Sequence, residues 1–215
     1  MDKQYKAIIF DLDGVLCFTD KYHYLAWKQI ADQLKISFDE KKNDRLRGVS
    51  RMQSLEIILE EYKGSLTETE KEKLADEKNK KYREYLMTMT EKDLTQEVKD
   101  TLETFRAKGI LMAVGSSSKN AELIIQRLGI ERYFDAVVDG NEITKSKPDP
   151  EVFLRAAEKL RLRPEECLVV EDAKAGILAA KEGGFDSAGL GSAVKDIGAT
   201  YCMESIIDLK KRFIN

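Results

Sequence analysis

Near its start the chain reads Tyr5-Lys6-Ala7-Ile8-Ile9-Phe10-Asp11-Leu12-Asp13-Gly14, a short apolar run that ends in two carboxylates and a glycine. An apolar run of this length, closed by a polar turn, is typical of a buried parallel strand. Open α/β sheets place their chemistry where such strands end. Two like charges this close are costly unless a cation or a bound phosphate uses them, although Asp-x-Asp also occurs as a turn with a helix cap.

The composition is that of an ordinary globular protein. The chain has 215 residues, 42% of them hydrophobic, which is enough for one full core and a small second lobe. Its net charge of −3 provides no basic field for a nucleic acid or an anionic membrane. We see no signal-peptide pattern and no apolar run of membrane-spanning length, so we expect a cytoplasmic protein. Cys17, Cys167 and Cys202 follow neither disulfide nor zinc spacing and are expected to be free thiols.

A wholly helical region follows the first strand. Apolar residues recur there at helical spacing in two sets, namely Tyr24, Trp27, Ile30, Ala31 and Leu34, and Met52, Leu55, Ile58, Leu59 and Tyr62. The stretch from Thr67 to Arg83 is dense in Glu and Lys, which is typical of a solvated helix face. We therefore expect residues 18–88 to form a small helical lobe inserted into a core that consists of residues 1–17 and 89–215.

Helix and strand alternate through the rest of the chain. Further strands are predicted at Ile110–Val114, Ala136–Val138, Leu168–Val170 and Phe185–Leu190. Alternation of this kind implies right-handed crossovers and a parallel sheet that is covered on both faces. The predicted fold class is therefore α/β, a Rossmann-like, doubly wound parallel sheet with an inserted helical domain.

Polar motifs follow the predicted strands or lie in the loops after them, so parallel strands would bring these motifs to one edge of the sheet. The motifs are Asp11 with Asp13, Ser116 to Asn120, Lys147-Pro148, and Glu171-Asp172. Asp11 and Asp172 offer the hard oxygen ligands that Mg²⁺ prefers, and Glu171 could orient them. Ser116, before a helix N-terminus, and the positive charge of Lys147 suit phosphate oxygens. One carboxylate attacking phosphorus while a second moves a proton would be covalent catalysis with general acid-base help.

Simpler interpretations exist for two of these residues. Lys147 could be an ordinary surface lysine. Ser118 could serve only as the N-cap of the helix that follows it.

In order and spacing these motifs resemble those of the haloacid dehalogenase superfamily of phosphotransferases. The resemblance covers nearly the whole chain and rests on Ile9-Phe10-Asp11-Leu12-Asp13-Gly14-Val15, Gly115-Ser116-Ser117-Ser118, Ser146-Lys147-Pro148-Asp149-Pro150 and Val170-Glu171-Asp172. It implies that Asp11 is the nucleophile, forming an aspartyl phosphate, and that Asp13 is the acid and base. It further implies a Mg²⁺ cofactor bound by Asp11, the Asp13 carbonyl and Asp172 with help from Glu171, and a transferring phosphate held by Ser116 and Lys147.

Within that superfamily the helical insert resembles the mobile cap of the β-phosphoglucomutase family. The match covers Thr19, Tyr22-His23 and Ala26-Trp27 at the cap entry, Arg47-Gly48-Val49-Ser50-Arg51 with Ser54 in a specificity loop, and Lys78-Asn79 with Tyr82 in the last helix. It implies that Thr19 and His23 belong to the catalytic set, His23 by helping to set up proton transfer. It also implies that the substrate is bound by Trp27, Arg47, Gly48, Val49, Ser50, Arg51, Ser54, Lys78, Ser117, Ser118, Lys119 and Asn120.

The cap residues include a second anion site. The resemblance implies that Arg51, Ser118 and Asn120 hold the phosphate that is not being transferred. Without the family, His23 would be interpreted as a packed helix residue and Arg51 as a surface charge. Phe18 departs from the family pattern, because related enzymes usually carry a polar residue, often Asp, at the cap entry.

The resemblance implies interconversion of β-D-glucose 1-phosphate and D-glucose 6-phosphate through bound β-glucose 1,6-bisphosphate and a phosphorylated Asp11. The alternative is a Mg²⁺-dependent phosphatase of the same fold that acts on a small phosphorylated sugar or acid. The second anion site favours the mutase, since a monophosphatase needs one anion pocket. A non-catalytic binding protein would lack the nucleophile, a metal ligand or the lysine, and none is missing. We expect a monomer with a small sugar phosphate as its partner, and no nucleic acid or membrane.

Overall fold

The computed structural model describes residues 3–47, 49–191 and 197–214. Its centre is a parallel sheet of six strands in the order β3-β2-β1-β4-β5-β6. These strands are β1 (Ala7–Phe10), β2 (Leu111–Gly115), β3 (Ala136–Val138), β4 (Cys167–Glu171), β5 (Asp186–Leu190) and β6 (Tyr201–Met203). Because β1 lies between β2 and β4, the residues that follow these three strands emerge side by side.

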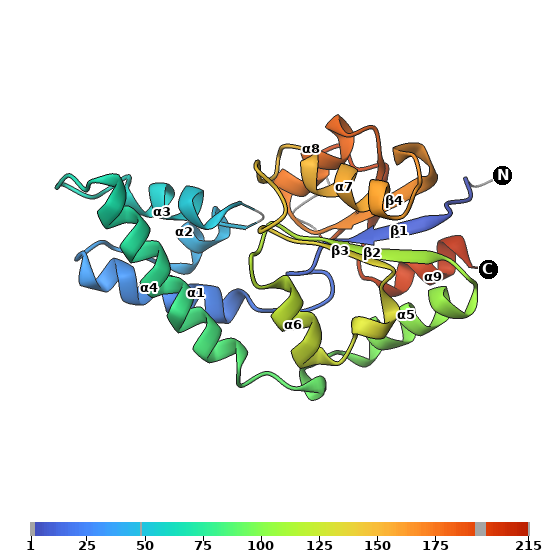
Figure 1. Cartoon of the computed structure of the whole chain (residues 1–215), viewed down its shortest axis with the longest axis horizontal. Coiled ribbons are helices and arrows are strands. Elements are labelled where there is room, and N and C mark those ends of the chain that lie inside the picture. The colour runs from blue at the N-terminus through green and yellow to red at the C-terminus, as the bar shows by residue number, and fades with distance from the viewer. Residues whose placement is uncertain (1–2, 48, 192–196, 215) are drawn as a thin grey trace.

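Helices cover both faces of the sheet (Figure 1). One face packs against α5 (Gln96–Ala107), α6 (Ala121–Leu128) and α9 (Ile207–Phe213), and the other against α7 (Glu151–Lys159) and α8 (Lys174–Glu182). The connections contain the short 3-10 helices η1 (Glu91–Asp93), η2 (Glu131–Tyr133) and η3 (Pro164–Glu166). Successive side chains of a strand point to opposite faces, so Ile8 and Phe10 join the first core and Ala7 and Ile9 the second.

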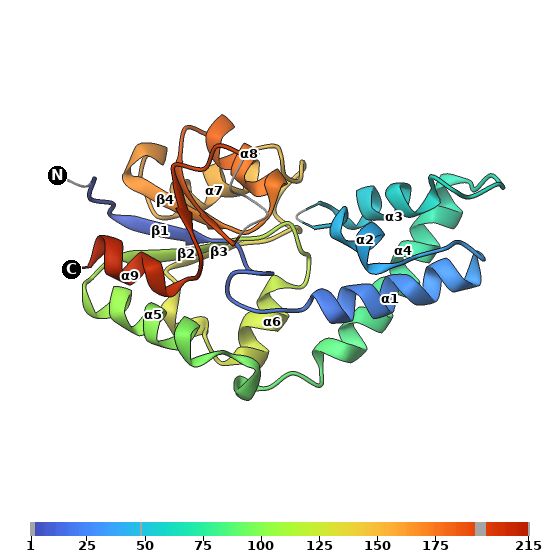
Figure 2. The ribbon, with the colours of Figure 1, turned by 180° about the vertical axis from the view of Figure 1, so that it is seen from behind.

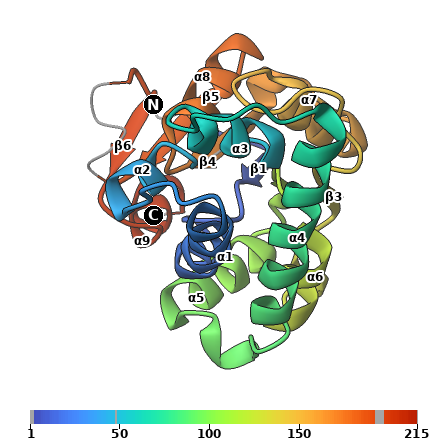
Figure 3. The same ribbon diagram turned by 90° about the vertical axis from the view of Figure 1, so that its left-hand side faces the viewer.

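The helical lobe inserted after β1 has a core of its own. It consists of α1 (Asp20–Gln33), α2 (Glu40–Asp44), α3 (Arg51–Leu59) and α4 (Glu68–Leu86). Trp27, Leu55 and Ile58 are buried at its centre. The lobe lies at the opposite end of the molecule from both chain termini (Figure 2), and in an end-on view it stands in front of the sheet (Figure 3).

The predicted fold class is confirmed, but two local features differ from expectation. Strand β6 was not predicted, because Tyr201-Cys202-Met203 lacks the β-branched residues that indicate a strand at Ala136–Val138. The interpretation of Ser118 as a helix N-cap is wrong, since α6 begins at Ala121 and Asn120 occupies the N-cap position. Ser118 Oγ instead accepts a hydrogen bond from the Asn120 N–H (3.2 Å), which stabilises a turn ahead of the helix. No helix in the described ranges is long and apolar enough to cross a membrane.

Candidate active site

Three carboxylates meet where β1 and β4 end. Asp11 directly follows β1, Glu171 is the last residue of β4, and Asp172 comes next. One oxygen from each lies within 4.8 Å of the others, and the described residues contain no other candidate metal-binding group of this kind. Burial raises the pKa of both Glu171 and Asp172 well above the ordinary range, and the charge of Asp11 adds to the effect. A small divalent cation such as Mg²⁺ would offset the repulsion between these buried carboxylates, and their hard oxygen atoms are the ligands that it prefers.

The turn after Asp11 is shaped to leave room for this group. Gly14 has a φ of +90°, and a Cβ at this position would overlap the carboxylate of Asp172. A residue with a side chain would therefore be strained and would also displace a candidate metal ligand.

Lys147 is wholly buried against these carboxylates, so the surface-lysine interpretation is wrong. Its Nζ donates to Asp11 Oδ1 and, at 2.6 Å, to Glu171 Oε1. Burial by itself would lower the pKa of Lys147, but the adjacent carboxylates of Asp11 and Glu171 raise it above its ordinary value. The ammonium group is therefore a fixed positive charge beside the candidate nucleophile.

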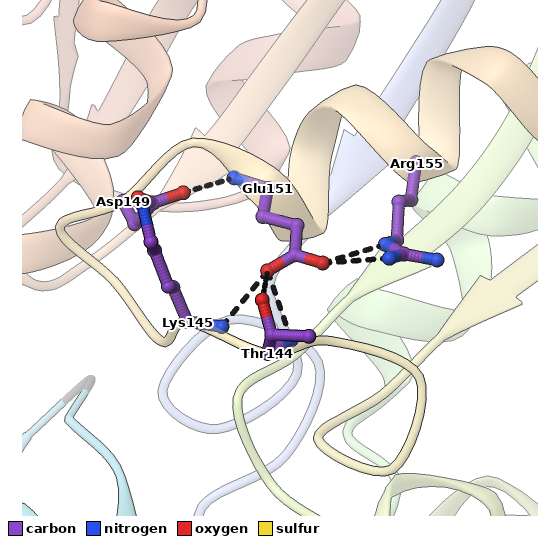
Figure 4. A network of polar contacts seen from close by, with 5 residues as sticks. All are labelled: Thr144, Lys145, Asp149, Glu151 and Arg155. Atoms are coloured by element: carbon purple, nitrogen blue, oxygen red, sulfur yellow. Dashed lines mark hydrogen bonds and ion pairs between the residues drawn. The ribbon is translucent and has the colours of Figure 1, made fainter.

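The loop that carries Lys147 is held by the carboxylate of Glu151, at the start of α7 (Figure 4). Glu151 Oε2 accepts hydrogen bonds from the backbone N–H groups of Thr144 (2.9 Å) and Lys145 (2.8 Å), while Oε1 pairs with Arg155 (2.7 Å). Chiefly the Lys145 N–H lowers the pKa of Glu151 to about 2, so the carboxylate stays ionised at neutral pH. Asp149 Oδ1 accepts from the Glu151 N–H (3.0 Å) and closes the network.

Asp13 is placed to exchange protons. Burial and, to a lesser extent, the charge of Asp11 raise its pKa, a hydrogen bond from the Thr19 hydroxyl opposes the rise, and the resulting pKa is about 7. Thr19 is fully buried and in turn accepts a hydrogen bond from the Tyr82 hydroxyl of α4 (3.1 Å). A carboxyl group with this pKa can both donate and accept a proton near neutral pH.

The loop after β2 forms a chain of serine hydroxyls. Ser116 Oγ accepts from the Ser118 N–H (3.1 Å), and Ser118 Oγ accepts from the Asn120 N–H. Because both oxygens are used as acceptors, both hydroxyl hydrogens remain free to donate to an anion. Ser117 Oγ is buried without a partner in the described part of the chain.

A pair formed by buried Lys78 and half-buried His23 joins two helices of the lobe. Lys78 of α4 lies 2.8 Å from Nδ1 of His23 on α1, and its Nζ is 5.0 Å from the ring centre of Trp27. Burial and, to a lesser extent, the charge of Arg51 lower the pKa of Lys78 to about 7. Burial also lowers the pKa of His23 well below its ordinary value, so the imidazole is neutral at pH 7.

Two arginines of the lobe, Arg47 and Arg51, pair with carboxylates. Arg47 pairs with Asp20 (2.5 Å) and reaches within 3.7 Å of Asp172 Oδ2. Arg51, the first residue of α3, lies 3.4 Å from the exposed carboxylate of Asp76. Burial lowers the pKa of Arg51 below its ordinary value.

One cavity between the lobe and the sheet brings most of the predicted residues together. It is lined by Asp11, Asp13, His23, Trp27, Arg47, Val49, Ser50, Arg51, Ser54, Lys78, Ser116, Ser117, Ser118, Lys119, Asn120 and Asp172. Three predicted residues lie behind this lining: Lys147 contacts Asp11, Glu171 contacts Lys147, and Thr19 contacts Asp13. The predicted binding residue Gly48 lies outside the described residues.

The cavity also contains residues that sequence reasoning missed, among them Asp20, Asn43, Leu46 and Gly140. Asp20 directly follows Thr19, and Gly140 follows a strand end, so both had a positional signal. Asn43, in the helix Glu40–Asp44, and Leu46, in the turn after it, lie in a stretch whose sequence pattern indicates only packing and solvation.

The comparisons with known proteins agree with this geometry. The model of the haloacid dehalogenase-like hydrolase family matches residues 5–184. The β-phosphoglucomutase of Bacillus subtilis is 42% identical over 207 residues, which cover 95% of this chain and 91% of that protein. The phosphorylated carbohydrates phosphatase of Thermotoga maritima is 32% identical over 222 aligned positions, covering 97% and 100%.

A solved structure gives the same result in three dimensions. The crystal structure of β-phosphoglucomutase from Clostridium difficile matches with a TM-score of 0.91 at 37% identity, and the match covers 96% of this chain and 94% of that one. Since the family model spans most of the chain and these relatives align along nearly its whole length, the protein belongs to the haloacid dehalogenase-like hydrolase family.

Proposed function

We propose that this enzyme interconverts β-D-glucose 1-phosphate and D-glucose 6-phosphate, with β-glucose 1,6-bisphosphate as the bound intermediate. The observation that carries the proposal is that one cavity is lined by two sets of groups able to bind an anion. Ser116 lies beside Asp11, with Lys147 bound to Asp11 from behind, and Arg51, Ser118 and Asn120 form the second set. A bisphosphate needs both sets. The relatives from Bacillus subtilis and Clostridium difficile, which carry the mutase name, support this assignment.

In the proposed reaction the phosphoryl group passes through Asp11. The carboxylate attacks phosphorus, the bond from phosphorus to the sugar oxygen breaks, and Asp13 gives its proton to that leaving oxygen. In the other half the free hydroxyl of a bound glucose monophosphate attacks the aspartyl phosphate, the bond from phosphorus to Asp11 breaks, and Asp13 takes up the hydroxyl proton. This step forms the bisphosphate, whose other phosphate is then presented to Asp11. A pKa of about 7 suits Asp13 to both tasks. Lys147 and Ser116 hold the phosphoryl oxygens during each transfer.

We further propose that the carboxylate cluster holds Mg²⁺ through Asp11, Asp172 and the Asp13 carbonyl, with Glu171 orienting the shell. When bound, the ion supplies positive charge that offsets the carboxylates and the phosphate. The raised pKa of Glu171 and Asp172 supports this assignment, because neighbouring carboxylates in a buried group need such compensation.

Residues 18–88 would act as a cap over a core made of residues 1–17 and 89–215. Closure would place Arg51 on the far phosphate and exclude water from the aspartyl phosphate. The remaining predicted lobe residues would contact the sugar and its phosphates. The buried free thiols of Cys17 and Cys167 are compatible with the cytoplasm.

The proposal is tested by following both possible products. The enzyme is incubated with Mg²⁺, β-glucose 1-phosphate and a trace of the bisphosphate, and glucose 6-phosphate and free phosphate are measured over time. We expect glucose 6-phosphate in large excess, and neither product from Asp11→Asn, which lacks the nucleophile. Release of free phosphate matching substrate loss would refute the mutase.

That second outcome would identify a sugar phosphatase. The core site alone would suffice for it, since water can replace the sugar hydroxyl at the aspartyl phosphate. The 32% identity to the Thermotoga maritima phosphatase, over the full length of that protein, favours this as the second candidate.

A further inference from the structure

Asn120, which lies just ahead of α6, is held at both ends of its amide by the lobe helix α4. Arg83 Nη1 donates to Asn120 Oδ1 at 2.9 Å, and Asn120 Nδ2 donates to Asn79 Oδ1 at 2.9 Å. The Asn120 side chain is buried, with 5% of the residue exposed. Helices α4 and α6 lie side by side at this point (Figures 1 and 3). The two bonds are therefore direct polar links between the lobe and the core.

These links decide which way the amide faces. A guanidinium group has donors but no acceptor, so only the carbonyl oxygen of Asn120 can face Arg83. The amide nitrogen then points to the other side, where one of its two hydrogens meets Asn79. The second hydrogen is left over. Asn79 and Asn120 both line the cavity, so this hydrogen is available to a ligand there.

Arg83 itself lies outside the cavity, in a shallow groove that it shares with Asp76 and Glu84. It forms no ion pair in the described part of the chain, while Glu84 pairs with Lys81 instead (2.9 Å). Carboxylates lie close to this surface arginine, yet it donates to a neutral amide of the core. We infer that the position of Arg83 serves its contact with that amide. Its effect on a ligand must be exerted through Asn120.

We propose that Arg83 and Asn79 are positioning residues for the anion pocket at Ser118 and Asn120, and that they complete this pocket only when the lobe is closed. With the amide held in this sense, the pocket presents two donors, the Ser118 hydroxyl and the free Asn120 N–H. A flipped amide would present its carbonyl oxygen and repel an anion. The inference rests on the proposed function, in which Asn120 grips the phosphate that is not being transferred.

The binding test is a double-mutant cycle. Affinity for β-glucose 1,6-bisphosphate is measured by titration calorimetry with Mg²⁺ in an Asp11→Asn background, which prevents turnover. Arg83→Met keeps the length of the side chain and is expected to weaken binding about tenfold, the effect of one lost charge-assisted hydrogen bond in the pocket. In an Asn120→Ala background the same change should cost nothing further, because Arg83 acts through the missing amide.

Lys80→Met is the matched control, since it removes an equal charge from an exposed position of the same helix. We expect the affinity of this variant to stay within about twofold of the parent, as for ordinary surface sites. Three results would overturn the proposal: unchanged binding in Arg83→Met, an equal loss in the Asn120→Ala background, or an equal loss in Lys80→Met.

A ligand-free measurement separates this inference from the proposed function. Glu72 on the lobe and Lys145 on the core are exposed and line the same groove. Each is replaced by cysteine in a Cys202→Ser background and spin-labelled, so that the distance between the labels reports the position of the lobe relative to the core. Arg83→Met should shift the distance distribution to longer values. An unchanged distribution would show that the contact of Arg83 with Asn120 does not hold the lobe against the core. A parent that binds the bisphosphate no better than orthophosphate would refute the proposed function. The label distances would then still show whether the contact of Arg83 with Asn120 holds the lobe against the core.

Discussion

Opposing influences act on the carboxyl group of Asp13. Burial and the charge of Asp11 raise its pKa, the Thr19 hydroxyl lowers it, and the balance lies at about 7. The Tyr82 hydroxyl of α4 donates to Thr19, and Lys78 of the same helix also lowers the pKa of Asp13. The pKa of Asp13 is therefore set by groups on α4 as well as by its place after β1.

Replacing Asp13 should remove proton transfer and leave the metal site largely intact. We expect Asp13→Asn to lower kcat by about 10² to 10⁴, the usual contribution of general acid-base catalysis. The half-saturating Mg²⁺ concentration should change little, because the proposed metal contact is the backbone carbonyl. Steady-state assays over a Mg²⁺ series check both values. Turnover within a few-fold of the parent would remove Asp13 from this role.

Lys78 should make the stability of the protein depend on pH. Its pKa is about 7 in the folded state, whereas an exposed lysine titrates near 10.4. Between these values the unfolded chain binds a proton that the folded chain lacks, so the free energy of unfolding rises with pH. The contribution approaches about 1.4 kcal/mol per pH unit at most.

The measurement is urea unfolding of the parent and of Lys78→Met at several pH values from 7 to about 9.5. Lys78→Met keeps the buried stem but has no charge to lose. The difference in unfolding free energy between parent and variant should grow in favour of the parent as pH rises. Parallel curves would show that Lys78 is charged in the folded protein.

The sequence predicts which residues meet at the site when the fold fixes their positions, but not when they meet through side-chain contacts between separate elements. Asp11, Ser116 and Asp172 follow strands of one parallel sheet, so their meeting is fixed by topology. The contacts of Arg83 with Asn120 and of Arg47 with Asp20 join residues on different elements of the lobe and the loops. Nothing in local pattern fixes such pairs, because they depend on how the lobe docks.

At the scale of elements, the strand and helix alternation was predictable because each element carries its own periodicity. The start of α6 was not, since Ser118 can cap a turn as well as a helix, and the actual turn uses its hydroxyl three residues before Ala121. The hydrogen bonds from the Lys147 loop to Glu151 could not be predicted either, because an acidic residue is common in the first turn of any helix, such as α7.

The turn after β1 gives a prediction at this scale. Gly14→Ala should lower activity by about 10²-fold or more and raise the half-saturating Mg²⁺ concentration, since the new Cβ would displace the Asp172 carboxylate. Gly109→Ala is the matched control, because Gly109 also has positive φ (+70°) but open space around its Cβ.

Both glycine variants should lose about 1 to 2 kcal/mol of stability from backbone strain, measured by urea unfolding. Only Gly14→Ala should lose activity beyond what that loss explains. An active Gly14→Ala enzyme with normal Mg²⁺ dependence would show that Asp172 can move without cost to the site.

At the scale of the whole molecule, lobe and core meet in two ways. At the roots of α1 and α4, Tyr22 and Leu86 pack into the same apolar cluster as the sheet. Around the cavity the links described above are polar, including those of Arg83 with Asn120 and of Arg47 toward Asp172. Apolar packing at the roots and polar contacts at the cavity are what a hinged lid requires. Sequence patterns could predict an inserted lobe but not this division.

The central claim is that the cavity holds two phosphates at once, and Arg51 tests it most directly. The measurement is the ratio of glucose 6-phosphate formed to free phosphate released, in the parent, Arg51→Ala and Arg45→Ala. Arg45 is an exposed arginine of the lobe paired with Glu60, outside the cavity, and serves as the control. A buried bidentate contact contributes roughly 3 kcal/mol, so the account predicts a fall in mutase turnover of at least about 10²-fold in Arg51→Ala. Phosphate release should fall far less, because water needs no distal phosphate to reach phosphorylated Asp11. The ratio should therefore collapse in Arg51→Ala and hold in Arg45→Ala; an unchanged ratio in Arg51→Ala would contradict the account.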